Sequence, residues 1–326
     1  MISRKINLTY ILFAVLLSIL VLGSSFGATV QAQEDPDIAI VYPIVHPFFE
    51  GTTRGAKEAA EDYGASVKTY GPNSGQASEQ INFMENLISK GVDAIAIGVT
   101  EPTSLTPYIN EAMDKGIPVV TFDTDAPQSD RLVFISTDNF EAGKNAAREA
   151  VNLLKEKYGE PKGKIIISMG VPTQNNLLQR LDGFKQVISE YENIKIVDQQ
   201  TGQGDPAKTT TNIENMLTAH PDADLLFGVD AQAGPSAVPI WKARGLDKFI
   251  VTFDDLPDIL KGIREGVITV SIVQRQYEFG YLAVESLVKA LDQKPLPVFM
   301  DTGTIRVTKG NIDRLKKLKK HTFKGE

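Results

Sequence analysis

Three aspartates stand directly after short apolar runs, where a β-strand would end. The tetrapeptide VTFD occurs twice, ending at Asp123 and at Asp254, and the apolar run 225–228 leads into Asp230. A carboxylate accepts hydrogen bonds from two hydroxyl groups at once, which suits a ligand with neighbouring hydroxyls. The simpler alternative is that each aspartate closes a turn or caps the next helix. A shared site requires elements that bring the three side chains together.

Short β-branched runs alternate with segments of helical period from residue 37 onward. The expected strands cover residues 38–42, 67–70, 94–98, 119–122, 132–135, 164–168, 194–198, 225–228, 250–253 and 269–273. The expected helices cover residues 48–63, 78–90, 103–115, 140–158, 176–190, 207–219, 236–244 and 277–291. This alternation indicates α/β architecture with parallel sheets. Because ligands bind outside the carboxyl ends of such strands, the three aspartates are expected at one site or at two facing sites.

The composition narrows the possible functions. The net charge is −7, and removal of residues 1–32 leaves 32 basic residues against 41 acidic ones, or −9. So acidic a chain is a poor nucleic-acid binder, because that affinity depends on Lys and Arg at phosphates. There is no cysteine and there are only three histidines, which removes thiol chemistry and argues against a histidine-rich metal centre. We therefore expect no catalytic residues, no metal and no cofactor.

The N-terminus reads as a targeting segment. Arg4 and Lys5 precede the apolar run 10–22, which is followed by small residues and then by Val30-Gln31-Ala32. This pattern is typical of a secretory signal, here residues 1–32, cleaved after Ala32. The alternative is an uncleaved membrane anchor, since residues 8–28 are just long enough to span a bilayer. Either way, the rest of the protein is expected in the periplasm or outside the cell.

Several short stretches, in their order and spacing, carry a family resemblance. They are residues 38–41 with 46–49, 118–123, 137–139 with Gly143, 180–184, 217–222, 253–254 and Gln274. Over residues 37–307 the chain resembles periplasmic sugar-binding proteins of the ribose-binding type, which serve ABC importers. The resemblance implies the type I periplasmic binding protein fold: two Rossmann-like lobes with parallel sheets, joined by a hinge of three crossings. Carried over, the first lobe is 37–138 plus 275–303, and the second is 139–274 plus 304–318.

The resemblance also assigns ligand-binding positions. It places four residues on the first loop of the N-terminal lobe: Tyr42, His46, Phe48 and Phe49. Neighbouring residues on a helix diverge by about 100°, so one of the two phenylalanines is expected to face the core. Asp123 and Asp254 match the ligand-binding carboxylates of the family, and Gln274 matches a ligand-binding glutamine at a lobe crossing.

Departures from the ribose-binding pattern affect the expected ligand. Asp230 stands where those proteins have asparagine, while Thr124 and Leu178 stand where they have arginine. Three nearby residues are candidates to compensate: Asn175, Asn176 and Arg180, the last with a surface or supporting role as the alternative. The expected site is rich in acceptors, with Asp125 as a further candidate. Since uncompensated buried carboxylates are costly, we expect a neutral or cationic, polyhydroxylated ligand rather than a sugar acid.

These inferences converge on a solute-binding protein that captures a monosaccharide or polyol and delivers it to an ABC transporter permease. We expect it to work as a monomer. The main alternative is a membrane-anchored module of the same fold that senses a sugar and reports to a sensor kinase. An extracytoplasmic glycosidase stays open as a less favoured alternative, because it needs only two suitably spaced carboxylates.

Overall fold

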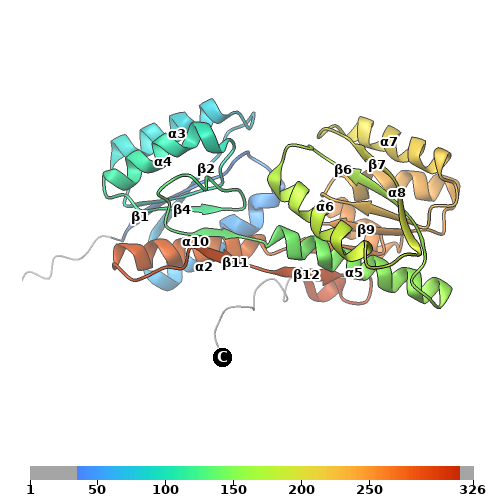
Figure 1. Cartoon of the computed structure of the whole chain (residues 1–326). Helices are drawn as coiled ribbons and strands as arrows, with labels where there is room; N and C mark the ends of the chain where they lie inside the picture. Colours follow the sequence, from blue (N-terminus) through green and yellow to red (C-terminus); the bar gives the residue numbers. More distant parts are fainter. Residues whose placement is uncertain (1–34, 316–326) are drawn as a thin grey trace, which may run out of the picture. The chain divides into compact units, whose positions relative to one another are not determined.

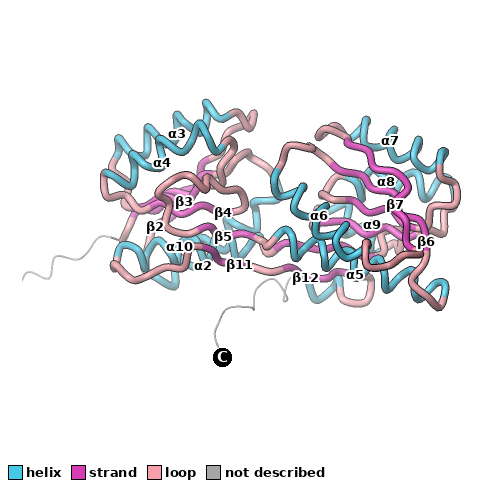
Figure 2. Tube along the Cα trace, in the orientation of Figure 1, coloured by secondary structure: helices cyan, strands magenta, loops and turns pink. Residues whose placement is uncertain are grey.

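Two β-sheets with flanking helices make up residues 35–315, the part of the chain that the computed structural model describes (Figures 1 and 2). The first sheet has the strand order β11-β5-β4-β3-β1-β2, and every neighbouring pair is parallel. Its strands are β1 (Asp37–Val41), β2 (Ser66–Tyr70), β3 (Ala94–Ile97), β4 (Val119–Phe122), β5 (Phe134–Ser136) and β11 (Phe299–Asp301). All their carboxyl ends therefore meet at one edge.

Helices cover both faces of this sheet. Helices α2 (Glu50–Tyr63) and α10 (Gln276–Leu291) pack on one face, where Phe279 joins the apolar cluster of β1 and β4. Helices α3 (Ala77–Lys90) and α4 (Pro102–Asp114) cover the other face, with Met84 and Ile109 fully buried. The strands β3 and β4 are buried along their length and β1 from Ile38 onward, as continuous apolar runs predict for a parallel sheet.

The second sheet repeats this plan with the strand order β12-β10-β9-β8-β6-β7. Its strands are β6 (Gly163–Met169), β7 (Ile194–Thr201), β8 (Leu225–Gly228), β9 (Phe249–Phe253), β10 (Val270–Gln274) and β12 (Thr304–Val307). Only the β10–β12 pair of this sheet is antiparallel. One face carries α5 (Asn139–Tyr158) and α6 (Asn175–Ile188); the other carries α7 (Pro206–Ala219), α8 (Ala233–Arg244) and α9 (Pro257–Arg264).

The chain passes between the two sheets after β5, after β10 and after β11. Two of these crossings are joined by hydrogen bonds. The amide of Thr302 donates to the Ser136 carbonyl at 2.9 Å. The Asp301 carboxylate accepts from the amides of Asp138 and Gly303, each at 2.8 Å. One side chain thus fixes the first and third crossings side by side.

In each half of the described chain, two helices can pack closely only because a glycine lies at their contact. A Cβ on Gly55 of α2 would lie 1.9 Å from the Tyr277 carbonyl oxygen of α10. In the second half, a Cβ on Gly143 of α5 would lie 2.0 Å from the Arg180 carbonyl oxygen of α6. The two helix pairs therefore approach backbone to backbone, and the second contact determines where Arg180 sits.

The predicted α/β architecture and its parallel sheets are confirmed, with differences in detail. The first helix begins as a 3-10 turn, η1 (Pro47–Phe49), before α2. The short strands β11 and β12 and the helix α9 were not predicted. The chain ends, within the described range, in η2 (Ile312–Arg314), which packs on the second sheet through Ile312.

The predicted signal segment 1–32 and the last residues of the expected second lobe lie outside the described residues. Within residues 35–315, no helix has both the length and the apolar character that crossing a bilayer requires.

Candidate functional site

The repeated VTFD sequence produces the same local geometry at two strand ends. Asp123 follows β4 with φ 61°, and Asp254 follows β9 with φ 69°. The Asp123 amide donates to the Ile135 carbonyl at 3.0 Å, and its own carbonyl accepts from Ser136 Oγ at 3.1 Å. Ser271 Oγ donates to the Asp254 carbonyl in the same way, at 2.5 Å. Left-handed conformations outside glycine are uncommon and cluster at binding sites, so both strand ends are site candidates.

Arg180 lies beneath this region and is buried, with 2% of its surface exposed. Its Nε donates to Asn139 Oδ1 at 2.9 Å and its Nη1 to the Val229 carbonyl at 3.3 Å. The guanidinium carbon lies 4.2 Å from the ring centre of Phe253, a cation–π contact. The Nη2 atom is buried and has no hydrogen-bond partner among the described residues. Arg180 is therefore not a surface residue, and it retains one donor without a partner in the described part of the chain.

The three aspartates share the positive charge of Arg180. Burial lowers the pKa of Arg180, while the charges of Asp254, Asp123 and Asp230 oppose that effect. Burial raises the pKa of Asp123 to about 7; the Arg180 charge counteracts this, and the Asp254 carboxylate adds to it. Since β4 belongs to the first sheet and β9 to the second, carboxylates from both sheets act on one cation. The site is acidic, but its charge is partly compensated.

Asp230 makes the turn contact that was the simpler alternative for it. Its Oδ1 accepts from the amides of Gln232 and Ala233 at 2.9 and 3.3 Å, the turn interaction at the start of α8. The carboxylate also packs against Gly170, where a Cβ would lie 2.1 Å from Oδ2. Burial raises the pKa of Asp230, and the two amides and Arg180 oppose that shift.

Two further candidates adjoin the aspartates. Gln274, at the end of β10, is buried and donates from Nε2 to Asp254 Oδ1 at 2.9 Å. Thr124 follows Asp123 directly, and its Oγ1 is buried without a hydrogen-bond partner in residues 35–315. An unpartnered buried hydroxyl is available to a ligand that displaces water from it.

The four residues of the first loop contact one another but differ in exposure. Tyr42 is buried, stacks on Phe49 at 5.0 Å and shares a hydrogen bond of 2.7 Å with Thr53. Phe49 faces the core and Phe48 is half-buried, as helical geometry predicts for such a pair. His46 is exposed, and its Nδ1 accepts from the Phe48 amide at 3.2 Å. Tyr42, His46 and Phe49 line a hollow of about 370 Å³ that extends to the end of β2 and includes none of the aspartates.

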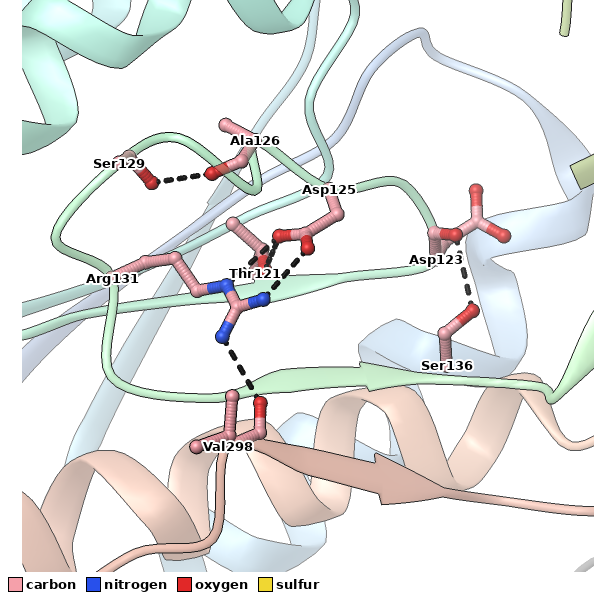
Figure 3. A network of polar contacts seen from close by, with 8 residues as sticks. All are labelled: Thr121, Asp123, Asp125, Ala126, Ser129, Arg131, Ser136 and Val298. Atoms are coloured by element: carbon pink, nitrogen blue, oxygen red, sulfur yellow. Dashed lines mark hydrogen bonds and ion pairs between the residues drawn. The ribbon is translucent and has the colours of Figure 1, made fainter. Parts of the chain in front are cut away.

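Asn175 and Asn176, which were expected to compensate for the arginines that this chain lacks, differ in exposure. Asn175 and Leu178 are exposed on α6, and Asn176 Oδ1 accepts from the Leu177 amide. Asp125 does not join the acidic site, because its carboxylate binds Arg131 and Thr121 (Figure 3). In the described residues, no group of three or more His, Cys, Asp or Glu side chains is placed to hold a metal ion.

Sequence reasoning missed the residues that support the aspartates. Ser136 and Ser271 lie on the strands next to Asp123 and Asp254, and Asn139 binds Arg180. The repeated VTFD tetrapeptide is the signal that could have found the two serines, since each VTFD strand has a neighbouring strand that carries a buried serine.

Comparison with known proteins gives consistent matches. A family model described as periplasmic binding protein domain matches residues 38–295. The ribose import binding protein RbsB of Bacillus subtilis (strain 168) is 27% identical over 241 residues, or 74% of this chain and 76% of that protein. A solved ABC transporter solute binding protein from Burkholderia graminis C4D1M, in complex with D-arabinose, is 35% identical with a TM-score of 0.78 and covers 86% of this chain and 97% of its own. The arabinose binding protein AraP from Geobacillus stearothermophilus is 28% identical with a TM-score of 0.79, covering 86% and 99%.

Proposed function

Because this chain belongs to the periplasmic binding protein family and has its type I fold, we propose that it is an extracytoplasmic solute-binding protein. It captures a monosaccharide or polyol at the carboxyl edges of its two sheets and delivers it to an ABC importer. The proposal takes its substrate class from the names of the relatives, which include ribose, arabinose and xylitol binders.

One observation carries the proposal on this chain's own residues. Asp123 and Asp254 stand at matching strand ends in the same left-handed conformation, and the charge of Arg180 reaches both. A ligand there meets carboxylate acceptors from both sheets at once. Such a ligand binds best when the sheets are drawn together around it, and only a preference of this kind produces a conformational signal.

The ligand that fits this charge pattern is neutral or cationic and rich in hydroxyls. The acceptors are Asp123, Asp254 and part of Asp230, while the unused donors are the Arg180 Nη2 and the Thr124 hydroxyl. Each hydrogen bond to a carboxylate contributes about 1.5–3 kcal/mol. An anionic sugar acid meets more acceptors than donors and is disfavoured.

A thermal-shift panel of pentoses, hexoses, polyols and sugar acids tests the proposal. A ligand present at about 100 times its Kd stabilises the folded state by about 2.7 kcal/mol, which is readily measured. We expect a neutral sugar or polyol to give the largest shift, with no consumption of that ligand. Stabilisation by sugar acids alone would contradict the ligand class, and turnover of a glycoside would contradict the binding function.

The membrane-anchored sensor stays an alternative on the same ligand chemistry. The sensor would keep residues 1–32 as its anchor, whereas the secreted solute-binding protein would lose them. Sequencing the N-terminus of the mature protein separates the two, since we expect a first residue after Ala32.

A further inference from the structure

A largely buried ion pair lies in the connection between β4 and β5, and the proposed ligand contacts do not use it. Arg131 donates from Nε to Asp125 Oδ1 at 2.9 Å and from Nη2 to Oδ2 at 2.7 Å (Figure 3). The two side chains are only 11% and 16% exposed. Thr121 of β4 donates to the same carboxylate at 2.6 Å. A two-pronged pair with so little exposure favours a single geometry, because the planar guanidinium and carboxylate match each other.

Arg131 also contacts the chain that leads into the crossing strand β11. Its Nη1 donates to the Val298 carbonyl at 3.0 Å, and the amide of Phe134 in β5 donates to that same oxygen at 3.0 Å. The Phe134 ring lies 5.9 Å from the guanidinium. One side chain therefore joins the connection after β4 to the two strands that lead into the first and third crossings.

The aspartates at the two VTFD strand ends, Asp123 and Asp254, differ in how their carboxylates are held. Asp254 Oδ1 accepts a hydrogen bond from Gln274. The Asp123 carboxylate accepts none from the described residues, and Figure 3 shows it directed away from Arg131. Its position depends on the backbone of residues 122–125, where the Thr124 amide donates to the Phe122 carbonyl at 2.6 Å. Whatever fixes that backbone also fixes the acceptor.

We propose that Arg131 and Asp125 are positioning residues for ligand binding. The pair fixes the backbone of residues 122–126, so that the Asp123 carboxylate and the Thr124 hydroxyl face the ligand, and it ties that segment to β11. Asp125 itself does not contact the ligand. This inference rests on the proposed function for the identity of the ligand, whereas the fixing of the segment is independent of it.

The test compares Arg131→Met with a matched control, Lys157→Met. Lys157 lies 2.9 Å from Asp224, and the two side chains are 32% and 9% exposed, so the control also removes the cation from a largely buried carboxylate. Asp224 immediately precedes β8 and lies at the edge opposite to the strand ends of the site. Both variants are expected to lower the Tm. Only Arg131→Met is expected to weaken binding of the sugar selected by the panel, by at least tenfold in Kd.

A milder variant and a ligand-free measurement keep the test decisive. Asp125→Asn preserves the shape of the side chain while weakening the pair, and we expect a smaller loss of affinity in the same direction. Hydrogen exchange of the amides in residues 122–126 is expected to be faster in Arg131→Met and in Asp125→Asn, while exchange in residues 253–257 stays unchanged. If the wild type binds a sugar and Arg131→Met retains its Kd and its exchange rates, the positioning role is refuted. If the wild type binds no sugar while exchange still rises, the proposed function fails and the fixing of the segment stands.

Discussion

The charge of Asp123 is expected to destabilise the fold while serving the ligand. Its pKa is about 7 in the folded protein, because burial disfavours the carboxylate, whereas an unfolded aspartate has a pKa of about 3.9. The folded state therefore binds this proton more tightly than the unfolded state does. The contribution of Asp123 to the free energy of unfolding is highest at acid pH, falls as the pH rises from about 4 to about 7, and stays low above that. Over about three pH units the loss has a ceiling of about 4 kcal/mol.

Asp123→Asn removes that charge and keeps the shape of the side chain. Asp123 retains some contact with solvent, so we expect about half of the ceiling, a gain of about 2 kcal/mol in unfolding free energy above pH 7. For a cooperative unit of about 280 residues, that corresponds to about 3 °C in Tm. Arg180 still faces Asp230 and Asp254 in the variant, so no buried charge is left alone. Affinity for the ligand is expected to fall, because an amide oxygen is a weaker acceptor than a carboxylate.

Urea denaturation of the ligand-free protein between about pH 5 and pH 8 measures this effect. The variant is expected to be more stable at the alkaline end and to lose most of the wild-type pH dependence. Asp130→Asn, a change at an exposed carboxylate on the same connection, is the control and should alter neither quantity. A variant that is less stable than the wild type above pH 7, or one with the same pH slope, would refute the reasoning.

Two further changes test how the site is built. Gly143→Ala places a Cβ 2.0 Å from the Arg180 carbonyl oxygen; because backbone must move, we expect a loss of about 1–3 kcal/mol in urea denaturation together with weaker ligand binding. Wild-type stability in that variant would show that the two helices can separate freely. Asp301→Ala removes the acceptor shared by the amides of Asp138 and Gly303; we expect both amides to exchange hydrogen faster and the stability to fall by about 1–2 kcal/mol. Unchanged exchange at both positions would show that the crossings do not depend on this side chain.

Local sequence was enough to predict the matched strand ends. The VTFD tetrapeptide combines β-branched and aromatic residues with one carboxylate after them, so both copies form strands that place an aspartate at the carboxyl edge. The short strands β11 and β12 gave no such signal. Each has only three or four residues and lacks an apolar run, and its pairing depends on a partner far away in the chain.

The partners of the charged groups were beyond sequence reasoning. Arg180 is buried because Gly143 lets α5 approach α6, which brings Asn139 within hydrogen-bond distance of its Nε. Asp125 has the residue type expected at an acidic site, but a fold-dependent contact with Arg131 occupies its carboxylate. Both outcomes depend on helix and loop packing between residues that no local pattern connects.

Calorimetric titration tests the central claim, that carboxylates at the two strand ends bind a hydroxyl-rich ligand. The sugar or polyol with the largest thermal shift is titrated into the wild type and into Asp254→Ala. Loss of the carboxylate removes up to two charge-assisted hydrogen bonds, or about 3 kcal/mol or more, so we predict at least a 100-fold increase in Kd. An unchanged Kd in a variant with the wild-type Tm would contradict the account.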